Sequence, residues 1–499
     1  MTMKSASRTD ILWLVLILAL ATLLRLWKLD APMWHDEIQT LVTHVHFRWG
    51  EMLQSYSMNH HYLHNFAVKL SIAAFGEAPW TVRLPAMLFG VATIWATWVL
   101  AREVAGTAIA HVTALLLALS YHEIWFSQNA RGYTGLALFS TLGLLYFLRG
   151  MKAPEWRNWI AFALCLVGAV FTHLTGAFFF VALGFLWLAV VLSRALRGTL
   201  RAPVVRLPFL GFLIGGLLTI IVYLPILPSV FHAVSTVSEG SAVDLMKEYQ
   251  NPVWTAFEAI RTGIGDAGPL VPVVGAAVLV LCVLGAISLH GAAPLFAPVV
   301  ALHIVLTTAL LMAVGMRIWP RFFFVDIGLM MILIVAGVRL SCTIIGRLAG
   351  GERVARALWL LGVVLMVLIS ALLAKRNYAF PKQDIAGAFA FVESARKPGD
   401  RAIALGYAGQ NVAYYGADWP VVYSDDEYRA AMEAPGTVFV LVGFPARVER
   451  DIPQYAADAG LRAGFDVCQD SPPPDAKLKI ARCFPGTLGD GYVLVFRRD

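Results

Sequence analysis

The sequence has 499 residues, of which 59% are hydrophobic and only 14% are charged. Soluble globular proteins contain about 45–50% apolar and about 25% charged residues, so this composition excludes an ordinary soluble domain and indicates a polytopic membrane protein. The formal net charge is +7, but the basic residues form short clusters between apolar stretches and no stripe with interleaved aromatics. This distribution argues against a nucleic-acid-binding protein.

About eleven apolar stretches have the length that a helix needs to cross a hydrocarbon layer roughly 30 Å thick. They cover residues 10–27, 81–101, 107–122, 133–149, 157–172, 176–193, 207–230, 269–289, 294–315, 322–340 and 356–374. The first stretch has no small-residue cleavage site and is followed by charged sequence, so we expect a retained signal anchor. The sequence therefore predicts an all-α membrane domain over residues 1–374.

Lys and Arg residues are concentrated in alternate short connections between the predicted spans. The clusters are Arg102; Arg149, Lys152 and Arg157; Arg194, Arg197, Arg201 and Arg206; and Arg347, Arg353 and Arg356. Cytoplasmic loops carry the excess of Lys and Arg, so this pattern favours an N-terminus inside the cell. The odd number of spans then places residues 28–80, 231–268 and 375–499 on the outer face.

The first two of these outer segments differ in composition. Apolar residues recur at helical spacing within 49–56 and again within 63–70, which predicts amphipathic helices along the membrane surface in the segment 28–80. Ser and Gly residues are frequent in 231–268. That composition is typical of a mobile loop, and a lid over a site is one use for it.

The tail, residues 375–499, alternates helical patterns with short apolar runs. Helices are expected over 385–394, 426–432 and 452–460, and strands over 402–405, 421–423, 438–442 and 492–496. This alternation predicts a small soluble α/β domain. Cys468 and Cys483 would face an oxidising compartment, where a disulfide between them and two free thiols are both open alternatives.

Two adjacent carboxylates follow the first predicted span, in the tetrapeptide WHDE at residues 34–37. A carboxylate held where a membrane meets water, beside an aromatic residue, has the surroundings in which a general base is tuned. Asp36 is therefore a candidate catalytic base.

The same outer segment contains half of the chain's histidines. They are His35, His44, His46, His60, His61 and His64. We expect His44 and His46 to be solvated or capping groups, as exposed histidines ordinarily are. His60 and His64 lie four residues apart and share a face on a helix, so with Glu37 or Asp36 they are candidate ligands of a divalent metal. Contacts to a phosphate group would explain the same residues, and both interpretations stay open.

Arginines recur at the outer ends of two predicted spans. The tetrapeptide ARGY at 130–133 opens the fourth span, and the pentapeptide RIWPR at 317–321 precedes the tenth. An arginine at this depth is costly unless it is paired or contacts an anion. Snorkelling to the interface is the alternative for Arg317. His173, between the fifth and sixth spans, is expected to make a polar contact within its loop.

In this order the motifs resemble those of the GT-C superfamily of polytopic glycosyltransferases, in particular the bacterial type of families 39 and 83. That type includes protein O-mannosyltransferases and lipid A aminoarabinose transferases. The resemblance covers roughly residues 10–375. It rests on the acidic pair at 36–37, NHHYL at 59–63, RLP at 83–85, ARGY at 130–133 and RIWPR at 317–321.

The resemblance implies a role for each motif. Asp36 would be the catalytic base and Glu37 its supporting carboxylate. The phosphate of the donor would be held by His60, Arg131, Arg317 and Arg321, and the substrate pocket would be lined by His35, His61, Tyr62 and Tyr133. The chain departs from the common pattern at His60-His61-Tyr62 and at Gln39-Thr40, so the sugar and the acceptor stay open.

The implied function is that of an inverting glycosyltransferase of the bacterial inner membrane, with its site and tail facing the periplasm. The donor is a polyprenyl-phosphate sugar, and the acceptor is a lipid, a glycan or a protein. Glycosyl transfer needs a base on the incoming hydroxyl and positive charge on the departing phosphate. A lipid phosphate leaves without a general acid, so no cofactor is required.

Two other classes of function compete with a transferase. A lipid or sugar transporter would have charged or broken helices near the bilayer midplane, and His303 is the main polar residue deep in a predicted span. A scaffold would use the tail domain to bind partners. Aromatic residues of the tail provide either a stacking surface or, more commonly, core packing. They are Tyr407, Tyr414, Tyr415 and Trp419.

Overall fold

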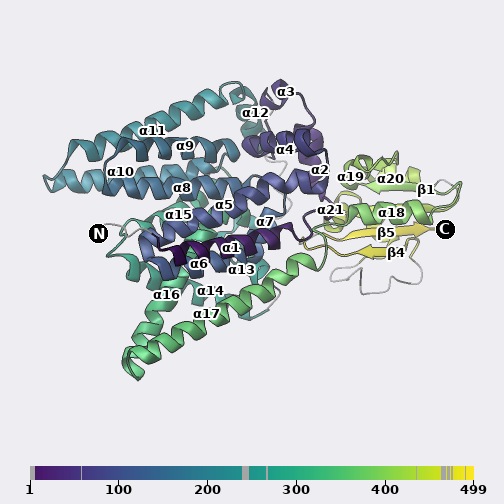
Figure 1. The fold of residues 1–499 in the computed structure, drawn as a ribbon. Coiled ribbons are helices and arrows are strands. Elements are labelled where there is room, and N and C mark those ends of the chain that lie inside the picture. The colour runs from purple at the N-terminus through teal and green to yellow at the C-terminus, as the bar shows by residue number, and fades with distance from the viewer. Residues whose placement is uncertain are drawn as a thin grey trace. The chain divides into compact units, whose positions relative to one another are not determined.

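The computed structural model describes residues 6–54, 56–57, 59–238, 247–265, 268–433, 435–461, 468, 473, 476–488 and 491–499 (Figure 1). The chain forms two compact units. The membrane unit comprises Met1–Trp27, Arg48–Gly76 and Thr81–Ala374, and the sheet unit comprises Lys28–Phe47, Glu77–Trp80 and Lys375–Asp499. The expected division between residues 374 and 375 stays a prediction. The observed units differ from it because two pieces of the first outer segment pack with the tail.

Within the described ranges, nine helices are long and apolar enough to cross a membrane. They are α1 (Arg8–Leu26), α5 (Pro79–Ala105), α8 (Tyr133–Lys152), α10 (Gly176–Leu196), α11 (Ala202–Tyr223), α14 (Leu270–Leu289), α15 (Phe296–Ala313), α16 (Phe324–Ala349) and α17 (Glu352–Ala374). Two other expected spans are shorter elements. Residues 107–122 form α6 (Thr107–Ala118) and the start of α7 (Tyr121–Ser127), which are bent by 58°, and residues 157–172 lie in the 17-residue α9 (Trp156–Thr172).

The break between α6 and α7 is stabilised by a buried arginine of α1. Arg25 donates hydrogen bonds to the carbonyl oxygens of Leu117 and Ala118, at 3.3 and 3.2 Å, and to Ser127 Oγ at 3.0 Å. The last carbonyls of a helix have no partner within the helix and carry partial negative charge, so a cation is favourable there. Arg25 therefore satisfies the end of α6 inside the membrane unit.

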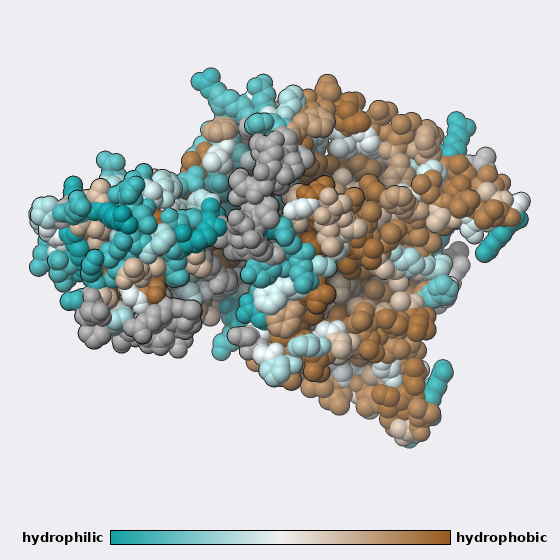
Figure 2. Space-filling view, turned by 180° about the vertical axis from the view of Figure 1, so that it is seen from behind, coloured by the Kyte–Doolittle hydropathy of each residue, from teal (hydrophilic) through white to brown (hydrophobic). Residues whose placement is uncertain are grey.

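The outer surface of the membrane unit is apolar. Figure 2 shows hydrophobic residues over much of its visible surface, and large exposed side chains include Leu16, Leu188, Ile221, Val280 and Leu365. Exposed apolar surface of this extent needs an apolar environment, which lipid chains provide. The fold confirms the expected polytopic all-α membrane domain.

The short helices of the first outer segment are α2 (His35–Thr40), the π-helix η1 (Leu41–Val45), α3 (Trp49–Gln54) and α4 (Tyr62–Phe75). In α4 the polar face is the buried one, since His64, Asn65 and Ser71 are buried while Leu70 and Phe75 are each 61% exposed. A helix with this polarity presents apolar side chains outward, as a helix at a lipid surface does.

The described part of the expected loop 231–268 is largely helical. It contains the end of α12 (Leu227–Ser238), η2 (Lys247–Gln250) and α13 (Pro252–Ile264). The side chain of Asn251 caps α13 by accepting a hydrogen bond from the backbone N–H of Val253 at 2.9 Å, a local signal that favours a helix over a loop. Residues 239–246, 266 and 267 of the expected loop lie outside the described residues.

The sheet unit contains a five-stranded mixed sheet with the order β2-β1-β3-β5-β4. The strands are β1 (Arg401–Leu405), β2 (Val421–Val422), β3 (Val438–Gly443), β4 (Lys479–Phe484) and β5 (Val493–Arg498). β1 pairs in parallel with β2 and β3, whereas β5 is antiparallel to β3 and β4. Every residue of β3 is buried, as a strand at the centre of a sheet covered on both faces requires.

Helices cover both faces of this sheet. α18 (Ile385–Ala395) and α19 (Ala408–Tyr414) pack on one face, and α20 (Asp425–Met432), α21 (Pro445–Asp451) and α22 (Pro453–Asp458) on the other. The expected α/β domain is therefore confirmed. The sequence did not predict α19, α21 or β4.

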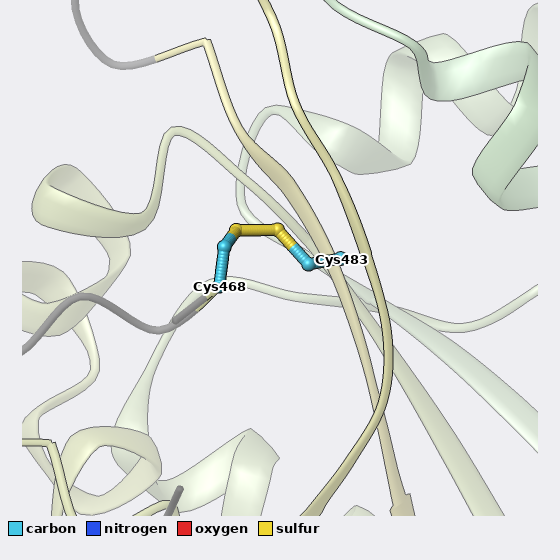
Figure 3. Close-up of a disulfide and its surroundings, with 2 residues drawn as sticks. All are labelled: Cys468 and Cys483. Carbon is cyan, nitrogen blue, oxygen red and sulfur yellow. A yellow bond between two sulfur atoms is a disulfide. The ribbon is translucent and has the colours of Figure 1, made fainter. Parts of the chain in front are cut away.

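Cys468 and Cys483 form a disulfide, with their Cα atoms 5.6 Å apart (Figure 3). Cys483 lies in β4, so the bond ties residue 468 to an edge strand of the sheet. The other three cysteines, Cys165, Cys282 and Cys342, are free thiols.

Candidate functional site

Three rings of the membrane unit meet in a buried cluster, here called the ring cluster: His61, Tyr133 and His173. The ring centroids are 5.2 Å apart for His61 and Tyr133, 4.8 Å for His61 and His173, and 5.5 Å for Tyr133 and His173. His61 precedes α4, Tyr133 begins α8, and His173 follows α9. Helix ends from three distant parts of the sequence therefore converge here.

Gly132 is required for this convergence. A Cβ at position 132 would lie 2.9 Å from His61 Nδ1 and 2.8 Å from the Cγ2 of Thr172. Both distances are shorter than real Cβ contacts. The glycine of the ARGY motif therefore lets the end of α9 and the start of α4 approach the backbone before α8.

Burial and the neighbouring arginines lower the pKa values of the two histidines in the ring cluster. Burial, reinforced by the positive charge of Arg131, lowers the pKa of His61 well below its usual value. Burial, together with Arg131 and Arg321, lowers the pKa of His173 to about 3. Both imidazoles are therefore neutral at pH 7. The region combines neutral imidazole groups with guanidinium charge, which is a suitable environment for an anion.

Buried nitrogen atoms of this region need hydrogen-bond partners. Among the described residues, neither ring nitrogen of His61 has one, and the Nε of Arg321 has none either. Buried polar groups are nearly always paired, so such atoms point to a ligand or to water. An oxyanion held here would supply acceptors for them.

The NHHYL motif contributes to two different clusters. Asn59 Oδ1 accepts a hydrogen bond of 2.6 Å from Arg131 Nη2, which fixes the guanidinium. His60 instead stacks on Tyr62, with their centroids 3.8 Å apart, and Tyr62 stacks on Phe171 at 5.6 Å. Asn59 and His61 thus belong to the ring-cluster region, while His60 and Tyr62 belong to an adjacent aromatic stack.

The two arginines of the RIWPR motif flank one tryptophan. The guanidinium carbons of Arg317 and Arg321 lie 5.9 and 4.8 Å from the centroid of Trp319. Trp319 packs on Tyr249 at 4.5 Å, and the backbone N–H of Ile318 donates to the carbonyl of Tyr249 at 2.7 Å. The described end of the segment 231–268 therefore positions this motif.

The acidic pair belongs to the sheet unit and lies in the first turn of α2. Glu37 is buried, and its Oε2 accepts a hydrogen bond of 3.3 Å from the backbone N–H of Trp34, so it caps the helix start. Asp36 is half-buried, and its carbonyl accepts a 2.7 Å hydrogen bond from Thr40 Oγ1. The side chain of Glu37 thus stabilises the helical turn that contains Asp36.

His35 fixes this short helix to the rest of the sheet unit. Its backbone N–H donates to Gln383 Oε1 at 3.3 Å, and its Nδ1 lies 3.2 Å from Asn411 Oδ1. Its ring is 4.9 Å from that of Tyr407. The structure therefore places His35 with the acidic pair, in a different unit from His61, Tyr62 and Tyr133.

The remaining histidines of the first outer segment have separate environments. His46 pairs with Glu77 at 2.8 Å, at a half-exposed position. His44 is buried in η1, so of the two expected alternatives the solvated one is wrong for this residue. His64 is buried in α4. In the part of the chain that the structure describes, no three His, Cys, Asp or Glu residues are grouped to hold a metal ion.

A groove of about 1130 Å³ runs between α13, α14, α15 and α16. Nearly all of its lining is apolar, from Ile318, Pro320 and Phe323 at one end to His290 and Pro294 at the other. Its polar lining residues include Asp326, whose carboxylate accepts from His303 Nδ1 at 2.9 Å. The RIWPR motif thus lines one end of a long apolar groove.

His173, Tyr249 and the groove were not assigned to the site from the sequence. The signal available for His173 was its position at the outer end of a predicted span, at the same level as Arg131. The groove had no local signal, because its lining residues are those of any lipid-facing helix.

Residues 59–227 match the sequence family described as dolichyl-phosphate-mannose-protein mannosyltransferase. No curated protein matches the chain in sequence. This region contains the NHHYL, RLP and ARGY motifs and the whole ring cluster. The family match therefore falls on the residues that the structure brings together.

The fold is similar to that of solved membrane glycosyltransferases. An oligosaccharyltransferase from Archaeoglobus fulgidus, tethered to an acceptor peptide, has a TM-score of 0.54 and 13% identity over 90% of this chain and 72% of its own. The enzyme AglB of that organism, in complex with an inhibitory peptide and a dolichol-phosphate, has a TM-score of 0.51 and 12% identity over 92% and 72%. ArnT from Cupriavidus metallidurans bound to undecaprenyl phosphate has a TM-score of 0.46 and 14% identity over 97% and 98%.

Proposed function

We propose that this protein, a glycosyltransferase of the GT-C superfamily, transfers a sugar from a polyprenyl-phosphate donor to an acceptor hydroxyl with inversion at the anomeric carbon. One observation carries the proposal. The RIWPR motif lines one end of the apolar groove, and its Arg321 also acts on His173 of the ring cluster. An apolar tail and a phosphate of one lipid molecule would be bound by these two adjoining features.

The cationic region supplies what the departing phosphate needs. As the glycosidic C–O bond breaks, negative charge grows on the phosphate while the sugar becomes oxocarbenium-like. Arg131 and Arg321 would stabilise that charge, and neutral His61 would donate one hydrogen bond without adding charge. The dolichol-phosphate bound to AglB, which shares the fold, supports a lipid-phosphate donor for this chain.

The acceptor hydroxyl needs a base, and Asp36 is the proposed one. Its carboxylate takes the hydroxyl proton while the oxygen attacks the anomeric carbon on the face opposite the phosphate. The polyprenyl phosphate leaves as a dianion, so no general acid takes part. Glu37 supports the base by capping α2 rather than by taking the proton itself.

We propose that the reaction takes place at the periplasmic face of a bacterial inner membrane. The Lys and Arg distribution favours this orientation, and a disulfide in the sheet unit is stable in an oxidising compartment. Two arginines suffice for the leaving phosphate, so we propose that no metal is needed. Turnover unaffected by EDTA supports this, and loss of turnover that is restored by Mg²⁺ or Mn²⁺ contradicts it.

A transporter would also need lipid- or sugar-sized cavities and broken helices. The bent pair α6 and α7 is such a break. Two carbonyl oxygens at this break, of Leu117 and Ala118, accept hydrogen bonds from the positively charged Arg25, which disfavours the binding of a cation there. The break therefore does not favour transport.

The test is Asp36→Asn in a strain that lacks the endogenous gene, with the glycan and lipid profile read by mass spectrometry. A general base contributes about 10²- to 10⁴-fold, so the variant should fail to restore the missing product. The control is Asp30→Asn, which removes another carboxylate of the sheet unit, one that accepts a hydrogen bond from the backbone of Trp80. Full restoration by a normally folded Asp36→Asn protein overturns the assignment of the base.

A further inference from the structure

A second pocket lies wholly within the sheet unit, at the carboxyl ends of its parallel strands. Its volume is about 250 Å³. Gly406 follows β1, Tyr423 follows β2, and Gly443 ends β3. Its lining also includes Tyr407, Phe444, Arg447 and Asp451.

The strand order makes this a topological switch point. From β1 the chain goes to β2 on one side, and β3 then pairs with β1 on the other side. Open α/β sheets bind their ligands in the crevice outside the carboxyl ends of the strands at such a point. The pocket is therefore where this architecture places a binding site.

The backbone at the pocket is unusual as well. Phe444 directly follows β3 and has φ of 56° and ψ of 63°, the left-handed region that a bulky residue rarely adopts. Such strain is kept where the surrounding structure fixes it, and it is concentrated at functional sites. Here it places the Phe444 ring against His35, at 5.4 Å, and Tyr407, at 6.2 Å.

The polar groups of the pocket form a fixed donor and acceptor pair. The Arg447 guanidinium lies 4.2 Å from the centroid of Tyr407, and its Nε donates to Asp451 Oδ2 at 3.2 Å. Asp451 also accepts from Arg450. The pocket therefore offers a guanidinium donor and a carboxylate acceptor, which adjacent sugar hydroxyl groups can bind together.

Tyr423 supplies an accessible aromatic face. Tyr423 is 60% exposed, whereas Tyr407 is 37% exposed and packs against His35 and Arg447. The apolar face of a pyranose ring packs on an exposed aromatic ring, and its rim of hydroxyl groups faces the polar pair. The volume is below the roughly 300–1,000 Å³ of pockets for drug-sized molecules, which fits a single sugar ring.

We propose that this pocket binds one pyranose unit of a glycan. The sugar stacks on Tyr423 and its hydroxyl groups bind Arg447 and Asp451. If the proposed transferase function holds, that glycan is part of the acceptor. Helix α2, which carries Asp36, is fixed through His35 to Tyr407 of the pocket wall, so the acceptor subsite and the proposed base belong to one unit.

Saturation-transfer NMR on the full chain in nanodiscs tests this proposal. The probes are the methyl glycosides of D-glucose, D-galactose and D-mannose. We expect at least one to bind the wild-type protein, Tyr423→Phe to retain binding, and Tyr423→Ala to weaken it about tenfold. The matched control is Tyr492→Ala, which removes an exposed tyrosine of the same unit outside the pocket.

Three outcomes overturn the proposal: none of the three glycosides binds the wild-type protein, Tyr423→Ala binds as the wild type does, or inorganic phosphate competes with the sugar. An unfolding temperature of the Tyr423→Ala protein equal to that of the wild type shows that the fold is intact. Binding is measured without turnover, so a failure of the sugar-binding proposal can be told apart from a failure of the proposed transferase function. An active Asp36→Asn protein that still binds the glycoside through Tyr423 contradicts the base and leaves the pocket in place.

Discussion

The ring cluster and the acidic pair are built in opposite ways. His61, Tyr133 and His173 come from three helix ends distant in sequence, and packing within the membrane unit holds them. Asp36 and Glu37 lie in one turn of a six-residue helix, which local hydrogen bonds and contacts to the tail hold within the sheet unit. The arginines and rings proposed to bind a lipid phosphate are therefore held by packing within the membrane unit. The proposed base is instead carried by the unit that also has the sugar-sized pocket.

Arg131→Ala should weaken the use of the lipid-linked donor, and we expect this variant to have the largest effect. Truncating a buried, hydrogen-bonded charge costs about 2–5 kcal/mol, so we expect kcat/KM for the lipid-linked donor to fall about 10²-fold. The control is Arg149→Ala at the other end of α8, where the arginine pairs with Glu103. Steady-state kinetics with varied donor measures both, and an equal loss in the two variants contradicts the phosphate role.

Removing the disulfide should destabilise the sheet unit and leave lipid binding by the membrane unit unchanged. Cys468→Ser with Cys483→Ser is expected to lower the stability of the sheet unit by about 2–4 kcal/mol, the usual contribution of a native disulfide. Binding of decaprenyl phosphate, measured by calorimetry in nanodiscs, should stay unchanged because its proposed site is in the membrane unit. A parallel loss of lipid binding would show that the phosphate site depends on the sheet unit.

Gly132→Ala should disturb the packing of the ring cluster and leave the sheet unit unchanged. The new Cβ would collide with His61 and Thr172, and overpacking of this kind costs about 1–3 kcal/mol. Gly216→Ala is the control, since nothing lies within 4 Å of a Cβ there. Thermal unfolding and donor kinetics together should show a loss for the first variant only. Equal stability and equal donor kinetics of the two variants would mean that the ring cluster accommodates the additional Cβ atom.

The neutral imidazoles predict a dependence of stability on pH. The pKa of His173 is about 3 in the folded protein and 6.5 ordinarily. Between these values the unfolded chain binds a proton that the folded protein does not, so stability falls as pH drops below 6.5, by up to about 1.4 kcal/mol per pH unit. His173→Asn should flatten the slope of unfolding temperature against pH from 6.5 to 4.5. An unchanged slope contradicts the neutral imidazole.

The sequence predicted the features that have a local pattern. Long apolar runs located the spans, and the motifs ARGY and RIWPR located arginines that the structure puts beside buried rings and a groove. Convergence of distant helix ends has no local pattern, and so the role of His173 was missed. The acidic pair was recognised, but its membership of the sheet unit depends on contacts of His35 with Gln383 and Asn411, far along the chain.

Two elements of the tail, β4 and α19, were missed for different reasons. β4 alternates apolar residues with Lys479 and Arg482, which suits an edge strand but hides it from a search for apolar runs. α19 is a seven-residue helix rich in small and polar residues, so its existence rests on packing against β1 rather than on propensity. α4, by contrast, has the amphipathic character that was predicted for this segment, with apolar residues such as Leu70 and Phe75 exposed.

The hydrogen bonds of Arg25 bear on the order in which the protein is made. Its carbonyl partners at the end of α6, Leu117 and Ala118, lie 92 and 93 residues further along the chain. A ribosome has therefore already delivered the first apolar segment to the membrane long before those partners exist. Within α1, the Arg25 side chain also donates to the carbonyl of Ala21 at 3.2 Å. Its two carbonyl partners at the end of α6 are added only once α5 and the rest of α6 have been synthesised.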